Sequence, residues 1–204
     1  MDKQEYLNQI SAKNRPTKKS GNKIFSSKFF WVGVIGVVAL ILIIIVGSML
    51  GGGKTSTKDK LFSLILHIDN TSEIIEEYQA NIKSSDLRSI SASLNSVLSN
   101  TSKDLNNYAA EKYNSKEKNT SEKITEEETV AKDDLYNELF EAKINGILDR
   151  IYARKMAYEI SIIVAREEQI LKASDDDMLK EHLNDSLNSL NILYDKFDNF
   201  SEAN

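Results

Sequence analysis

Hydrophobic residues are distributed in two distinct ways along this chain. Between residues 29 and 50 they form an uncharged run of mostly Val, Ile and Leu. Beyond Gly53 they recur every three or four residues between polar and charged positions. The first pattern is typical of a membrane-spanning helix, and the second predicts amphipathic helices that pack face to face.

The apolar run is long enough to cross a bilayer. A helix of about 22 residues rises about 33 Å, which exceeds the roughly 30 Å hydrocarbon core. At its start, Lys28, Phe29, Phe30 and Trp31 have the composition of a membrane-interface anchor. We therefore expect a transmembrane helix over 29–50. Its apolar core is longer than that of a cleaved signal peptide, which favours an uncleaved signal-anchor, although the small residues after position 46 leave cleavage open.

The charges flanking the run predict its orientation. Residues 1–28 carry seven Lys or Arg side chains and two acidic ones, and no acidic residue lies between positions 13 and 28. The positive-inside rule places such a segment in the cytoplasm. The predicted organisation is a basic cytoplasmic tail (1–28), the span (29–50), a glycine-rich hinge (51–56) and an extracytoplasmic helical bundle (57–204) in the cell membrane.

The remainder of the chain is predicted to be helical throughout. Its apolar stripes indicate helices over 57–83, over a segment with Ser85 as N-cap, over 121–172, and over a last segment preceded by the acidic capping residues 175–177. A polar loop is expected near 113–120. Gly146 is the position at which the third helix would be kinked or broken.

The expected fold class is therefore all-α, with one N-terminal transmembrane helix followed by an antiparallel four-helix bundle. The single proline is Pro16, and Gly146 is the only glycine after Gly53, so turn residues are too sparse for a β fold. Segments 82–86 and 171–175 resemble each other, and each precedes a helix that contains Ser-Leu-Asn-Ser. These matches suggest two duplicated helical hairpins, with chance similarity as the alternative.

Composition argues against several functions. Residues 54–204 contain 19 basic and 29 acidic side chains, a formal charge of −10, which is unfavourable for binding nucleic acid. The chain has no cysteine and only two histidines, His67 and His182. We expect no catalytic residue, no cofactor and no metal site, because no nucleophile is paired with a base and no metal-ligand spacing occurs.

One cluster of cations and phenols stands out from the acidic background. Its members are Arg150, Tyr152, Arg154 and Tyr158. Arg150 and Arg154 share a helix face at i,i+4, so the cluster is a candidate surface for an anionic partner. The alternative is an ordinary helix whose bases pair with the neighbouring Asp149 and Glu159.

Several short segments carry a family resemblance. They are residues 6–10, 82–88, 148–150 and 153–159, together with the single span. In these features the chain resembles uncharacterised single-span membrane proteins of reduced-genome bacteria of the Saccharibacteria type. The resemblance implies an anchor in the bacterial cell envelope with an exterior helical domain and no known activity. That domain is also similar in outline to ferritin-like helical bundles, but their Glu-x-x-His metal ligands do not occur here.

The expected function is a membrane-anchored, non-catalytic module with a structural or interaction role. Its expected partners are the lipid bilayer and an envelope or membrane protein. Gly47 and Gly51 have the spacing of a helix-dimer face, which leaves a homo-oligomer open. The alternative is a ligand-sensing bundle that signals through a separate membrane partner, since 1–28 is too short for a signalling domain.

Overall fold

A computed structural model describes residues 56–113 and 122–200. In these two ranges every regular element is a helix, which confirms the all-α class for this part of the chain. The elements are α3 (Thr57–Gln79), α4 (Ser85–Tyr113), α5 (Glu122–Ile144), α6 (Leu148–Ala173) and α7 (Asp177–Asp198).

Several sequence predictions fall on other residues. The span over 29–50, its interface residues Lys28, Phe29, Phe30 and Trp31, the tail before them, and nearly all of the hinge and of the polar loop lie outside the described ranges. Among the helices α3 to α7, none combines the length and the apolar composition that a membrane crossing requires.

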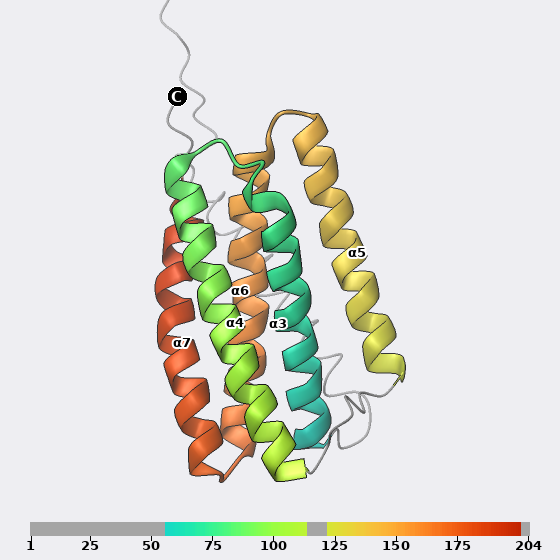
Figure 1. Cartoon of the computed structure of the whole chain (residues 1–204), viewed down its shortest axis with the longest axis vertical. Coiled ribbons are helices and arrows are strands. Elements are labelled where there is room, and N and C mark those ends of the chain that lie inside the picture. The colour runs from blue at the N-terminus through green and yellow to red at the C-terminus, as the bar shows by residue number, and fades with distance from the viewer. Residues whose placement is uncertain (1–55, 114–121, 201–204) are drawn as a thin grey trace, which may run out of the picture. The chain divides into compact units, whose positions relative to one another are not determined.

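The predicted four-helix bundle is present, but a fifth helix packs outside it. Helices α3, α4, α7 and α6 form a closed ring, in which each helix contacts the next. Helix α5 lies beside this ring and, among the described helices, packs mainly against α3 and α6 (Figure 1). It runs parallel to α3, because Glu128 lies beside His67 and Tyr136 lies beside Tyr78.

The fifth helix arises because the predicted helix over 121–172 is two helices. Gly146 has a φ of 71°, which is the left-handed conformation that glycine adopts without steric cost. The N–H of Gly146 donates to the carbonyl of Lys143 at 3.2 Å, and the N–H of Ile147 donates to that of Ala142 at 3.0 Å. These two hydrogen bonds form a Schellman motif, which ends α5 and turns the chain into α6.

Polar side chains determine where the other helices begin. The N–H of Leu87 donates to Ser84 Oγ at 3.2 Å, so Ser84 rather than the predicted Ser85 caps α4. At the start of α7, Asp176 accepts a hydrogen bond from the N–H of Leu179. The acidic turn after α6 therefore has the capping role predicted for it.

The core of the ring is apolar. Its largest fully buried side chains are Tyr152, Phe197, Leu61, Leu64, Ile68, Ile74, Ile75, Ile82, Leu87, Leu94, Leu98 and Leu105. Burial of such side chains is the main favourable contribution to folding, at roughly 1.5–3 kcal/mol each. The hairpins α3–α4 and α6–α7 lie side by side in the ring. Their duplication stays a prediction that superposition of the two hairpins would test.

Candidate functional site: a buried ion network

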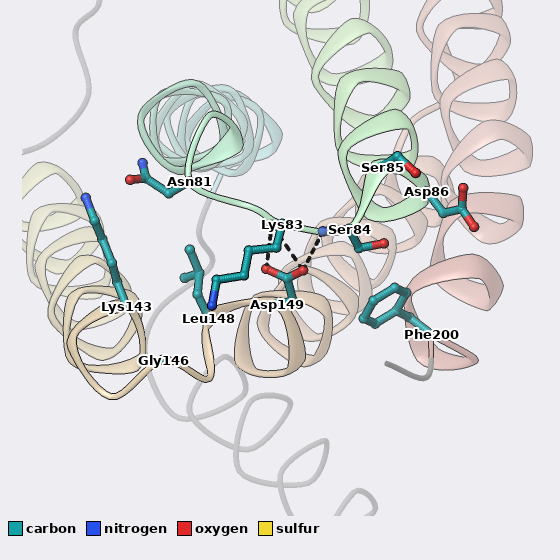
Figure 2. A pocket seen from close by; sticks show the side chains of 10 residues that line it. All are labelled: Asn81, Lys83, Ser84, Ser85, Asp86, Lys143, Gly146, Leu148, Asp149 and Phe200. Carbon is teal, nitrogen blue, oxygen red and sulfur yellow. Dashed lines mark hydrogen bonds between the residues drawn. The ribbon is translucent and has the colours of Figure 1, made fainter. Parts of the chain in front are cut away.

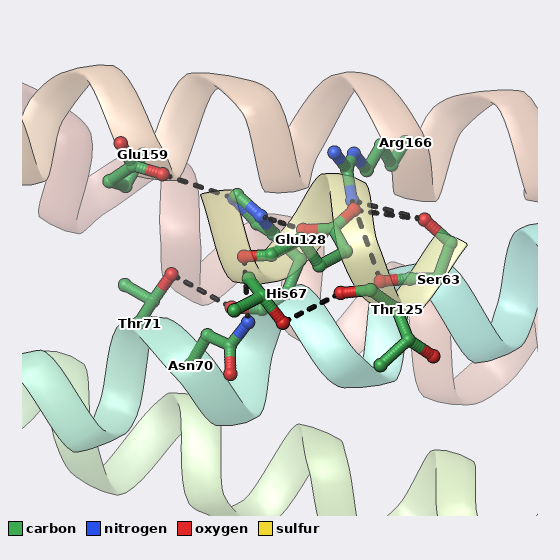
Figure 3. Close-up of polar contacts among 9 residues, drawn as sticks. Ser63, His67, Asn70, Thr71, Thr125, Glu128, Glu159 and Arg166 are labelled. Carbon is green, nitrogen blue, oxygen red and sulfur yellow. Dashed lines mark hydrogen bonds and ion pairs between the residues drawn. The ribbon is translucent and has the colours of Figure 1, made fainter. Parts of the chain in front are cut away.

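A histidine lies between two carboxylates where α3, α5 and α6 meet (Figure 3). The Nδ1 atom of His67 is 2.8 Å from Oε2 of Glu128, and its Nε2 atom is 3.1 Å from Oε2 of Glu159. The first contact is a well-formed hydrogen bond, whereas the second is at ion-pair distance without good hydrogen-bond geometry. All three residues are buried. Both ring nitrogens therefore face a negative charge.

Glu128 is the centre of the network. Its Oε1 atom is 2.5 Å from Nη1 of Arg166, on α6, and accepts a 3.1 Å hydrogen bond from Ser63 Oγ, on α3. Its backbone carbonyl accepts a 3.2 Å hydrogen bond from Asn70 Nδ2, also on α3. One side chain of α5 thus connects that helix to both of its neighbours.

The contacts within the network raise the pKa of His67 and lower that of Glu128. Burial alone would lower the pKa of His67, but the carboxylates of Glu128 and Glu159 outweigh it, and the pKa lies above the ordinary 6.5. Burial would raise the pKa of Glu128, yet the hydrogen bond from His67 and the charge of Arg166 hold it at about 2. With His67 protonated, two positive and two negative charges balance.

The chemistry available to this site is proton exchange. The gap beside the network measures about 10 Å³, which is close to the minimum for a single water molecule. No substrate of ordinary size fits there. His67 faces Glu128 and Glu159 rather than Asp69, and the other histidine, His182, lies on α7. Among residues 56–113 and 122–200, no group of three or more acidic or histidine side chains has the arrangement of a metal site.

A second buried polar chain crosses the ring from α4 to α6. Thr101 Oγ1 donates to Ser186 Oγ at 3.0 Å, and Ser186 Oγ donates to Oε1 of Glu167 at 2.7 Å. Glu167 is fully buried, and its Oε2 atom has no hydrogen-bond partner. Burial raises the pKa of Glu167 to about 8 against the opposing hydrogen bond from Ser186. This carboxyl group is therefore protonated near neutral pH.

A surface pocket lies beside the α3–α4 and α5–α6 turns (Figure 2). It has a volume of about 770 Å³, and Lys83 and Lys143 line it. The buried carboxylate of Asp149 accepts hydrogen bonds from the N–H of Lys83, at 3.0 Å, and from that of Ser84, at 2.7 Å. Asp149 thus occupies the position at the α4 N-terminus where an anion would bind.

Only part of the predicted cationic cluster lies on the surface. Arg150, Arg154 and Tyr158 are exposed on α6, but Tyr152 is fully buried. Its hydroxyl group lies 2.6 Å from Ser91 Oγ, and its ring packs against Phe197. Tyr152 lies on the core side of the helix, two residues from each arginine, so it cannot contact a partner.

The alternative expectation for these arginines is also wrong. Asp149 bonds to the α3–α4 turn, and Glu159 pairs with His67. In the described part of the chain, neither Arg150 nor Arg154 has a carboxylate within ion-pair distance. Both guanidinium groups are therefore available at the surface.

Sequence reasoning missed the buried network, although a signal was present. His67 lies next to Ile68 on the apolar stripe of α3, and Glu167 lies between Ile163 and Ile170 on that of α6. A titratable residue on an apolar stripe is buried when the helix packs, and a buried charge requires a partner. Glu128 gave no such signal, because it follows Glu126 and Glu127 in an acidic run.

Comparison with known proteins identified no relative. No protein-family model, no curated protein and no solved structure matches the chain.

Replacing Glu167 tests the consequence of its burial. In the parent chain the folded state retains a proton that the unfolded state releases near pH 4.5, so stability falls as the pH rises from about 4.5 to about 8. One proton gives a slope of at most about 1.4 kcal/mol per pH unit. The Glu167→Gln variant has no ionisable group at this position. We therefore expect its free energy of unfolding to lack the decrease between about pH 4.5 and about pH 8.

Urea denaturation of the full-length chain in mild detergent, at a series of pH values, measures the difference. The matched control is Glu168→Gln, because Glu168 is exposed and pairs with Lys172. It should keep the parent slope. If the free energy of unfolding changed with pH in the same way in the parent chain and in Glu167→Gln, the raised pKa of Glu167 would be contradicted.

Proposed function

We propose that this protein is a single-pass membrane anchor that presents an extracytoplasmic helical bundle, with a structural or binding role rather than a catalytic one. The observation that carries the proposal is the uncharged run over 29–50, preceded by seven basic residues. Helix α3 begins at Thr57, six residues after Gly51, so the bundle follows the run almost directly in the sequence.

We propose the exposed face of α6 as the binding surface. Arg150 and Arg154 have no ion-pair partner there within residues 56–113 and 122–200, and Tyr158 is 39 % exposed on the same helix face at the next i+4 position. Arg150 lies near the N-terminus of α6, where the helix dipole disfavours a positive charge. A cation kept at an unfavourable position without an ion pair is better explained by an external anionic partner.

A ligand-sensing bundle that signals through a separate membrane partner is the second candidate. The observation that favours it is the presence of two buried ionisable clusters, around His67 and Glu167. A bundle whose packing energy depends on protonation responds to its surroundings without a separate ligand pocket.

Protease treatment of intact cells followed by mass spectrometry tests the placement. We expect peptides from 54–204 to be released and residues 1–28 to be protected, because the basic tail lies inside. Permeabilised cells are the control and should release both. Release of 1–28 with protection of 54–204 would invert the topology and contradict an exterior bundle.

Photo-crosslinking in cells tests the binding surface. A photoreactive aromatic amino acid in place of Tyr158 should give a crosslinked product in the full-length chain. Double charge reversal, Arg150→Glu with Arg154→Glu, should reduce that product by about tenfold or more, corresponding to about 1.4 kcal/mol of lost binding. Lys196→Glu, at an exposed position of α7, is the matched control and should leave the product unchanged. Equal crosslinking in the double variant would remove this face from the proposal.

A further inference from the structure

The two halves of α5 are attached to the ring by different forces. In its C-terminal half, Leu135, Leu139 and Ala142 are buried. Tyr136 also packs edge-on against Tyr78, whose hydroxyl group donates to the Tyr136 carbonyl at 3.1 Å. This half is held by apolar burial, which does not depend on pH.

The N-terminal segment of α5 (residues 122–134) has a different attachment. Its one buried residue is Glu128. Lys132 also pairs with Glu73 of α3 at 2.6 Å, but Glu73 is mostly exposed, and exposed ion pairs contribute little. The segment is therefore held chiefly by the contacts of Glu128 with Ser63, His67, Asn70 and Arg166.

The strength of this attachment depends on one proton. A neutral imidazole has a single N–H group and no charge, so it can still donate to Glu128 but no longer forms an ion pair with Glu159. Arg166 and Ser63 would still hold Glu128, while no other cation pairs with Glu159 in the described ranges. Loss of the proton also leaves a net negative charge in a buried site, which is strongly unfavourable.

We propose that the N-terminal segment of α5 is a proton-dependent cover of the α3–α6 groove, attached most firmly while His67 is doubly protonated and detaching more often when His67 is neutral. Detachment would uncover the polar groove residues His67, Thr71 and Glu159 together with Ile74. Only contacts among the described helices carry this proposal, so a failed topology experiment would leave it intact.

The direction of the pH effect follows from the charged groups that face His67. These are Glu128 and Lys132 from α5, and Glu159 and Arg166 from α6. The pKa of His67 is raised, so its contribution is complete below about pH 6.5 and is lost as the pH rises through the folded-state pKa. The pKa of Glu128 is about 2, so its contribution is complete above about pH 4.5. Attachment is therefore strongest between these two limits and weakens on the alkaline side.

Hydrogen exchange of the full-length chain in mild detergent tests the proposal, with mass spectrometry after labelling at pH 6 to 9. Protection factors, corrected for the intrinsic pH dependence of exchange, are compared between 122–134 and the rest of the bundle. We expect protection of 122–134 to fall by up to about tenfold per pH unit between about pH 6.5 and the raised pKa of His67, since the attached state retains a proton that the detached state releases, and to level off above that pKa. In a Glu167→Gln background, which removes the titration of the carboxyl group on α6, protection of 135–144 and of α6 should change little.

Variants separate this effect from others. His67→Gln keeps a hydrogen-bonding side chain without the charge, and it should lower protection of 122–134 at pH 6 and remove the pH dependence. Glu73→Gln breaks the exposed pair with Lys132 and should keep the parent profile. Hydrogen exchange is also measured in a Glu167→Gln background, because this substitution removes the titration of Glu167, the other buried group with a pKa in this range. In that background, equal protection of 122–134 across the pH range, persistence of its pH dependence after His67→Gln, or simultaneous loss of protection in all helices would each overturn the proposal.

Discussion

The attachment of α5 depends on a buried histidine that has a carboxylate on each side. His67 can satisfy Glu128 and Glu159 together only in its doubly protonated form. With Arg166 the network then has no net charge, and each buried charge has an opposite one nearby. Removing one partner of a buried ion pair costs about 3–5 kcal/mol, because the other charge is left without compensation. The protonation state of one side chain thus affects how firmly the N-terminal segment of α5 packs against α3 and α6.

The ring of α3, α4, α7 and α6 does not depend on the charge of His67 in the same way. Its core consists mostly of Leu and Ile side chains with little or no exposure. Its buried carboxyl group, Glu167, is held neutral by burial and so places no charge in the core. The described chain therefore combines a ring stabilised by apolar burial with one helix whose first half is held by charge. A difference of this kind allows a local change in packing without unfolding of the whole bundle.

Much of the fold could be predicted from the sequence, because apolar periodicity is a local property. The helix periods, the start of α3 at Thr57 and the acidic cap of α7 follow from residues close together in the chain. The break at Gly146 was visible as a possibility, but its outcome depends on a backbone conformation that residue identity alone does not determine.

The candidate site was harder to predict from the sequence, because it joins residues about 30 to 100 positions apart on three helices. In the sequence, Glu128 is part of an acidic run that is typical of a solvated helix face, and only the packing of α5 against α3 and α6 buries it. Tyr152 was assigned to a surface because its neighbours Arg150 and Arg154 are basic, whereas helical geometry directs it into the core. Tertiary packing determines burial in both cases, and burial determines the chemistry.

The most direct measurement is the pKa of His67, obtained from an NMR titration of the full-length chain with isotope-labelled histidine. The chain has only two histidines, so a His182→Gln variant leaves a single signal to assign. We predict a pKa above 6.5, because the two carboxylates outweigh the effect of burial. A pKa at or below 6.5 would mean that burial outweighs the two carboxylates, and it would contradict a network that holds α5 through a charged histidine.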